Sequence, residues 1–216
     1  MAEIRAELVK ELRDRTGISI MQCRKALEEA GGDLEKAIAV LQSKSGEAAS
    51  KKSDRTLGAG TVASYIHSTG NVGTLVELLC ETDFVAKNEG FKALANDIAL
   101  HIAALSPKYL SREEVPAELV EKEKNIYREQ MQGENKPAEI IEKIIDGKMG
   151  KFYSEICLLE QPFIKDEEKT IEQLLAAKTG EIGEKITIRR FARYGVGEGI
   201  EKKETDFVAE VSAQLG

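Results

Sequence analysis

The chain has few of the residues, and none of the long apolar segments, that several protein classes require. It contains no Trp, two His, three Cys and four Pro among 216 residues. No stretch approaches the roughly 20 apolar residues of a membrane-spanning helix. Residues 1–15 carry charges every few positions, unlike the unbroken apolar region of a signal peptide. We therefore expect no membrane segment and no membrane partner.

The sequence also lacks the motifs that mark most catalytic and cofactor sites. It has no His-x-x-x-His or Cys-x-x-Cys pair with metal-ligand spacing and no Gly-x-x-x-x-Gly-Lys-Ser/Thr loop for nucleoside triphosphates. We expect no metal, no cofactor and no enzymatic activity. A cysteine-dependent enzyme stays open as an alternative, because spacing in the sequence does not exclude a Cys–His pair formed in the fold.

Cysteine usage and net charge narrow the class further. Cys23, Cys80 and Cys157 are an odd number, lie far apart and sit in apolar patterns. This usage is typical of buried thiols in the reducing cytoplasm, where we expect the protein to work. The net charge of −7 argues against nucleic acid as a partner, because a protein that binds nucleic acid needs a basic face.

The N-terminal part has the pattern of three short helices. Apolar residues recur at helical spacing in three segments that glycine-containing turns separate. Ser19 followed by Gln22 is typical of a capping box, and Asp33 can cap the third helix. We interpret residues 1–43 as a small helical module. Residues 44–56, rich in Ser, Lys, Ala and Gly, are interpreted as a linker that is helical at most in part.

Residues 57–216 combine strand and helix patterns. Segments 60–68 and 72–81 resemble strands on either side of a hairpin turn, and residues 184–196 resemble a third strand. The predicted fold class is α+β. It consists of a three-helix module, then a small antiparallel sheet packed with helices, and a helix at the C-terminus.

Four further helices are expected in this second domain. Residues 91–105 form a clean apolar stripe, and a short helix is expected at 170–178. Pro116 and Pro137 each suit the start of a helix. The helix after Pro116 has few apolar residues and is expected on the surface. The helix after Pro137 carries an apolar stripe over 141–156 and is expected to pack.

The hexapeptide ETDFVA occurs twice, at residues 81–86 and 204–209. A six-letter recurrence in a chain of this length indicates a shared structural or binding role. The Thr-Asp pair suits a helix N-cap, and the next residue is a Phe where a helix start usually meets solvent. Phe84 is therefore either a core residue under a capped turn or a presented aromatic that enters a pocket on a partner. Phe207 has the same two interpretations.

The two histidines have simple interpretations from the sequence. His67 ends a strand before the hairpin turn and is expected at the surface. His101 lies beside the apolar stripe of its helix. It is either a boundary histidine with a satisfied hydrogen bond or a functional residue.

Four separated segments resemble one family. In chain order they are VKELRDRTGISIMQCRKALEEAGGDLEKAI, ETDFVAKNEGF, QPFIKDEEKTIEQLL and GEGIEKKETDFVAEV. Together they resemble the bacterial translation elongation factor Ts family over almost the whole chain. The resemblance implies a ubiquitin-associated-like fold for the N-terminal helices. It also implies guanine-nucleotide exchange on the GTPase elongation factor Tu, without any covalent chemistry.

The resemblance also implies which residues meet this partner. In the family a TDFV motif contacts the GTPase near its magnesium site and disturbs magnesium and phosphate coordination. The matching residues here are Thr82, Asp83, Phe84 and Val85.

A second set of residues matches the docking surface of the family's N-terminal module. These are Arg13, Ile20 and Met21, with Ile20 standing where the family has a methionine. His101 matches a family histidine that can lie in the partner interface. The second TDFV copy, at 205–208, is expected to cap the C-terminal helix.

The chain resembles a short form of the family, because long members carry a second sheet-containing module and a coiled-coil hairpin. A half-size core leaves an apolar face uncovered. We therefore expect a homodimer that covers the stripes at 91–105 and 141–156. An alternative from another class is a non-catalytic adaptor, whose three-helix module binds a ubiquitin-like or other protein partner.

Overall fold

The computed structural model describes residues 4–51, 54–131 and 137–200. The second ETDFVA copy, Phe207 and the predicted C-terminal helix lie outside the described residues. The elements in chain order are α1 (Ala6–Thr16), α2 (Ile20–Glu29), α3 (Leu34–Lys51), β1 (Ala59–Ile66), β2 (Val72–Cys80), α4 (Asp83–Lys87), α5 (Glu89–Leu105), η1 (Arg112–Glu114), α6 (Ala117–Gln130), α7 (Ala138–Ile156), η2 (Leu158–Glu160), β3 (Pro162–Phe163), β4 (Asp166–Thr170), α8 (Ile171–Ile182) and β5 (Thr187–Gly195).

Helices α1 to α3 form a module with its own apolar core. The core residues Leu12, Cys23, Leu27, Ala37 and Leu41 are at most 4% exposed. The predicted caps at Ser19 and Asp33 are present, but the Gln22 side-chain oxygen accepts from the Ser19 hydroxyl, which leaves the predicted capping box incomplete. The Ser19 hydroxyl accepts from the Gln22 backbone N–H, the Asp33 carboxylate accepts from the Lys36 N–H, and Gly17 ends α1 with φ 70°. The sequence pattern therefore located all three helices.

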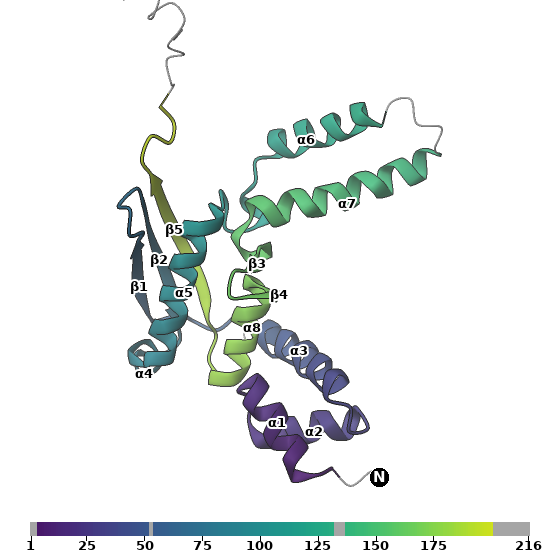
Figure 1. Ribbon diagram of the computed structural model, residues 1–216, viewed down its shortest axis with the longest axis vertical. Helices are drawn as coiled ribbons and strands as arrows, with labels where there is room; N and C mark the ends of the chain where they lie inside the picture. The colour runs from purple at the N-terminus through teal and green to yellow at the C-terminus, as the bar shows by residue number, and fades with distance from the viewer. Residues whose placement is uncertain (1–3, 52–53, 132–136, 201–216) are drawn as a thin grey trace, which may run out of the picture.

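Helix α3 continues to Lys51, through most of the segment interpreted as a linker. Ser45, within that segment, is buried. A Cβ atom added at Gly180 of α8 would lie 3.1 Å from the Ser45 hydroxyl oxygen, so the two helices pack closely. The N-terminal module is thus packed against the second domain through α3 rather than joined to it only by a polar tether (Figure 1).

The second domain is built on a three-stranded antiparallel sheet with the order β1-β2-β5. Because side chains alternate along a strand, Val76, Leu78 and Cys80 of β2 face a common core with α5, whereas Leu75 faces away. Helix α5 covers one face of the sheet (Figure 1). Phe91 and Ile98 of α5 are fully buried there. The α+β class predicted from the sequence is confirmed.

Helices α6 and α7 form a hairpin that projects away from the sheet (Figure 1). Helix α7 packs on α6 and η2, and its residues Ile145 and Met149 are buried. The Lys148 ammonium lies 5.1 Å from the centre of the Tyr127 ring of α6. The sheet covers the stripe over 91–105, whereas the α7 stripe is covered only in part, because Ile141, Phe152 and Ile156 stay partly exposed. The expected homodimer stays a prediction.

A second, two-stranded sheet was missed by the sequence analysis. It pairs β3 with β4. Strand β4 leads directly into α8, where Thr170 and Gln173 form a capping box. The Phe163 ring is buried in the main core and lies 6.0 Å from the ring of His101.

Candidate partner-binding site

The first ETDFVA copy forms the end of β2 and the short helix α4. Thr82 is the N-cap of α4, and its hydroxyl oxygen accepts from the Val85 N–H at 3.5 Å. Phe84, in the first turn, is 82% exposed. Because the side chain of Phe84 makes no part of the core, its interpretation as a core residue is wrong. A ring with this much exposed surface is free to be buried by a partner.

Asp83 lies beside Phe84 and carries a negative charge at neutral pH. Its carboxylate accepts from the Lys87 ammonium at 2.7 Å, one helical turn away. That hydrogen bond, together with the charge of Lys87, holds the pKa of Asp83 below its ordinary value. The Asp83 side chain is 62% exposed, so both members of the Asp-Phe pair face solvent.

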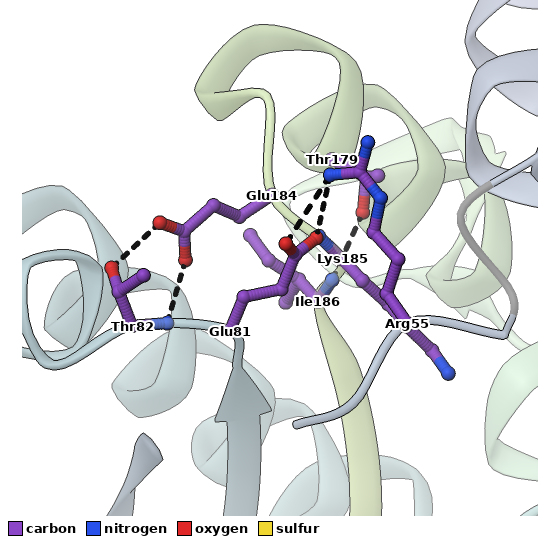
Figure 2. Close-up of polar contacts among 7 residues, drawn as sticks. All are labelled: Arg55, Glu81, Thr82, Thr179, Glu184, Lys185 and Ile186. Atoms are coloured by element: carbon purple, nitrogen blue, oxygen red, sulfur yellow. Dashed lines mark hydrogen bonds and ion pairs between the residues drawn. The ribbon is translucent and has the colours of Figure 1, made fainter. Parts of the chain in front are cut away.

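The other two residues of the motif make contacts within the protein, although Thr82 is itself exposed. Val85 is partly buried and packs against the main core. Thr82 is engaged by Glu184, whose carboxylate accepts from the Thr82 hydroxyl at 2.6 Å and from its N–H at 3.0 Å (Figure 2). The structure thus separates the TDFV motif into a presented pair, Asp83 and Phe84, and two residues that hold it.

Glu184 belongs to the turn between α8 and β5, which is fixed by further hydrogen bonds (Figure 2). The Lys185 N–H donates to the Glu81 carboxylate at 2.6 Å. The Ile186 N–H donates to the Thr179 hydroxyl oxygen at 3.2 Å. Sequence analysis missed Glu184, because no local pattern connects it with a residue 102 positions earlier.

The Glu81 carboxylate also holds the chain that arrives from the N-terminal module. One guanidinium nitrogen of Arg55 lies 3.2 Å from each of its oxygens (Figure 2). The Glu81 side chain is 19% exposed, so this ion pair is less screened by water than an open surface pair. The start of the motif is therefore tied both to the α8–β5 turn and to the segment before β1.

The predicted docking residues of the N-terminal module lie at its surface. Ile20 and Met21, in the first turn of α2, are 58% and 68% exposed. Arg13 of α1 is also exposed. Figure 1 places α4 and the helices α1 and α2 in the lower half of the molecule. Two apolar side chains next to each other at a helix start form a second presented surface.

His101 is fully buried rather than at a boundary. Its Nδ1 accepts from the Ile164 N–H at 3.2 Å, and its Nε2 lies 3.1 Å from the Gln161 side-chain oxygen. Burial lowers the pKa of His101, so the ring is neutral at neutral pH. Direct contact between His101 and a partner would require a change in the packing of β3 over α5.

The described residues contain no cluster of metal ligands, and the three thiols are buried. No group of three His, Cys, Asp or Glu side chains in ranges 4–51, 54–131 and 137–200 could hold a metal ion. All three cysteines are buried, and burial raises the pKa of Cys157 to about 11, which suppresses the reactive thiolate. Within the same ranges no helix is long and apolar enough to cross a membrane.

A cleft of about 1070 Å³ lies between α3 and α8. Its lining includes Glu35, Ser45, Glu168 and Leu175. Neither Phe84 nor Met21 lines it. The candidate site is therefore a pair of protruding apolar side-chain groups rather than a concave pocket, a shape that suits contact with another protein.

Comparison with known proteins gives a consistent match along the chain. The family model described as "Elongation factor TS" matches residues 3–198. Three proteins named "Elongation factor Ts" are similar to the chain over almost their whole length. Identity is 56% with that of Desulforamulus reducens (100% of this chain, 99% of the relative), 57% with that of Acetivibrio thermocellus (98% and 99%) and 57% with that of a Geobacter species (99% and 99%).

Proposed function

The chain belongs to the elongation factor Ts family of translation elongation factors, and on that premise we propose that it promotes release of GDP from elongation factor Tu. It does so by binding and without covalent chemistry, in the cytoplasm, where translation takes place. Exchange of this kind needs no catalytic side chain. It needs a surface that binds the nucleotide-free conformation of the GTPase more tightly than the GDP-bound one.

The single observation that carries the proposal is the presentation of Phe84. The Phe84 side chain is 82% exposed, so it contributes little to the folding free energy of the free protein. Its burial by a partner contributes favourable binding free energy. The Phe84 ring enters between helices of the GTPase. The Asp83 carboxylate, brought in with it, places a negative charge near the magnesium ion and weakens its coordination to GDP.

The N-terminal module adds affinity through a separate contact. Ile20 and Met21 dock on the same GTPase, with the Arg13 guanidinium beside them. Because α3 packs on α8, the module and α4 belong to one packed body, and binding of one brings the other close to its target. The docking residues contribute to the stability of the complex, and Phe84 contributes to the change in the GTPase.

We also propose that two copies of the chain pair through the open face of the main sheet. Val62, Ile66, Leu75 and Tyr194 are 65%, 67%, 48% and 73% exposed, and the strand register places them on the face opposite α5. The same face carries Glu77, which lies opposite Val62 and is ion-paired with Arg189 and Arg190. Four exposed apolar side chains beside this polar group favour an interface with a polar part. A two-fold axis lets each sheet cover the other, which replaces the second half of the core in long members of the family.

The experiment that tests the exchange function is release of a fluorescent GDP analogue from elongation factor Tu, with and without the protein. The expected result is release that accelerates with protein concentration and reaches a plateau when the partner is saturated. Binding without any acceleration would contradict the exchange function and would fit an adaptor instead.

A further inference from the structure

Helix α4 is too short to fix the direction of Phe84 by itself. It has five residues, and an isolated helix of that length is not stable in water. Its own N-cap bond, from the Val85 N–H to the Thr82 hydroxyl, is long at 3.5 Å. None of the residues of α4 is buried. The direction in which Phe84 points therefore depends on contacts from outside the helix.

The carboxylate of Glu184 supplies such contacts at the residue just before the helix. Its two oxygens accept from the Thr82 hydroxyl at 2.6 Å and from the Thr82 N–H at 3.0 Å. Two hydrogen bonds to one residue fix both its side-chain rotamer and its peptide plane, and an ionised acceptor makes them stronger than neutral ones. Because the hydroxyl hydrogen goes to Glu184, a lone pair of the same oxygen is left to accept from Val85.

The turn that carries Glu184 is held in return by the strand end that carries Thr82. The Glu81 carboxylate accepts from the Lys185 N–H, and the Glu184 carboxylate accepts from the Thr82 N–H (Figure 2). The end of β2 and the α8–β5 turn therefore each bind the backbone of the other through a carboxylate. We call Glu81, Thr82, Glu184 and Lys185 the carboxylate clamp. Its reciprocal bonds fix the α8–β5 turn and the start of α4 as one unit.

We propose that Glu184 is a positioning residue for nucleotide exchange, which acts through Thr82 to hold α4 so that Phe84 points toward the partner. The inference rests on the proposed function of Phe84. Glu184 itself does not touch the partner in this account. Its loss leaves Phe84 in the chain but lets α4 open, so that fewer encounters bring the ring between the helices of the GTPase.

The test is a double-mutant cycle in the full-length protein. Glu184→Ala is compared on the wild-type and on the Phe84→Ala background, by the maximal rate of fluorescent GDP release at saturating protein. We expect Glu184→Ala to lower that rate about tenfold in the wild type, as for loss of two solvent-exposed hydrogen bonds to a charged group. On the Phe84→Ala background it should have little further effect, because both changes act through one side chain.

Two variants and one control sharpen the comparison. Glu184→Gln keeps one acceptor oxygen and should recover part of the rate. Thr82→Val removes both the hydroxyl bond to Glu184 and the N-cap bond from the Val85 N–H, so it should slow release at least as much as Glu184→Ala. If Glu184→Ala does not fold, Glu184→Gln takes its place in the cycle. The matched control is Glu167→Ala, at an exposed position of β4, which should behave as the wild type.

A second readout does not depend on the partner. Hydrogen exchange of the Val85 and Ala86 amides reports opening of α4, and it should be about tenfold faster in Glu184→Ala and unchanged in Phe84→Ala. Unchanged amide exchange, or an equal loss of rate on both backgrounds, overturns the positioning role and leaves the proposed function intact. A wild-type release rate for Phe84→Ala overturns both.

Discussion

At the scale of single residues, His101 shows how burial decides the charge state of a side chain. Its ring accepts a hydrogen bond from the Ile164 N–H at Nδ1, which only a neutral imidazole can do. The ring lies between α5 and the β3–β4 sheet, where solvent does not reach it. A proton added to Nδ1 would break that bond and place a charge in the core.

Stability should therefore fall at mildly acidic pH. The pKa of His101 is lowered in the folded state, so the unfolded chain binds the proton more tightly. The stabilisation is present above the unfolded pKa of about 6.5 and is lost as pH falls below it. Thermal melting between pH 7.5 and 5.5 measures this. His67→Asn, which removes an exposed histidine, should keep the pH dependence, whereas His101→Asn should flatten it. A flat wild-type profile would contradict the account.

The first TDFV motif shows what single residues of a sequence do and do not predict. The Thr-Asp cap could be read directly, because capping is local chemistry. The exposure of Phe84 could not, since an isolated Phe in a sequence is more often buried. The role of Glu184 could not be predicted from the sequence, because Glu184 and Thr82 lie 102 positions apart and only the fold brings them together.

Asp83 should matter less than Phe84 for exchange. The Asp83 carboxylate is exposed and paired with Lys87, so Asp83→Ala removes a surface charge and an ion pair of small energy. We expect catalysed GDP release to slow by a few fold. Asp83→Asn keeps the shape and separates the effect of the charge. A larger loss for Asp83→Ala than for Phe84→Ala would contradict the role of the aromatic ring as the main contact.

At the scale of elements, periodicity located helices and strands but not their packing partners. The apolar stripe of α7 correctly predicted a helix that packs. It does not identify the packing partners, which are α6 and η2. The β3–β4 sheet could not be predicted from the sequence. Strand β3, Pro162–Phe163, is too short to show alternation, and β4, with the sequence DEEKT, is polar. The C-terminal end of α3 resembles a linker in its polar composition. Its contacts with α8 form only in the folded chain, so the sequence does not predict them.

Helix α2 should contribute affinity without contributing to the exchange step. Ile20→Ala with Met21→Ala removes two exposed apolar side chains, so the melting temperature should not change. Burial of one such side chain on a partner is worth about 1.5–3 kcal/mol, so the dissociation constant should rise about tenfold or more. At saturating protein the release rate should equal that of the wild type. Ile140→Ala, at an exposed position of α7, is the control.

A fall in the maximal rate, with the dissociation constant unchanged, would contradict this division between α2 and α4. Stopped-flow release measured over a range of protein concentrations separates the two quantities, because the midpoint reports binding and the plateau reports the exchange step.

At the scale of the whole molecule, the open sheet face predicts a homodimer. A stable dimer interface typically buries more than about 1,200 Å² in total. Leu75→Glu places an unpaired charge at the centre of the proposed interface, so this variant should be monomeric. Ile126→Glu, on α6 away from the sheet, should leave the dimer intact. Sedimentation equilibrium at micromolar concentration measures both. A wild type that sediments only as a 23.7 kDa species would contradict the proposal.

For the whole molecule, exchange depends on one side chain in contact with the partner. Removal of the Phe84 ring should cost about 1.5–3 kcal/mol of contact with elongation factor Tu, and about 1.4 kcal/mol is one decade. The fold should survive, because a ring that is 82% exposed adds little to the core. Phe207→Ala, in the second copy of the motif, is the internal control.

The most direct measurement is stopped-flow release of a fluorescent GDP analogue from elongation factor Tu, with wild-type protein and with Phe84→Ala, alongside thermal melting of both. The account predicts an unchanged melting temperature and catalysed release that is slower by about ten- to a hundredfold. A Phe84→Ala protein that unfolds, yet exchanges at the wild-type rate per folded molecule, would contradict it.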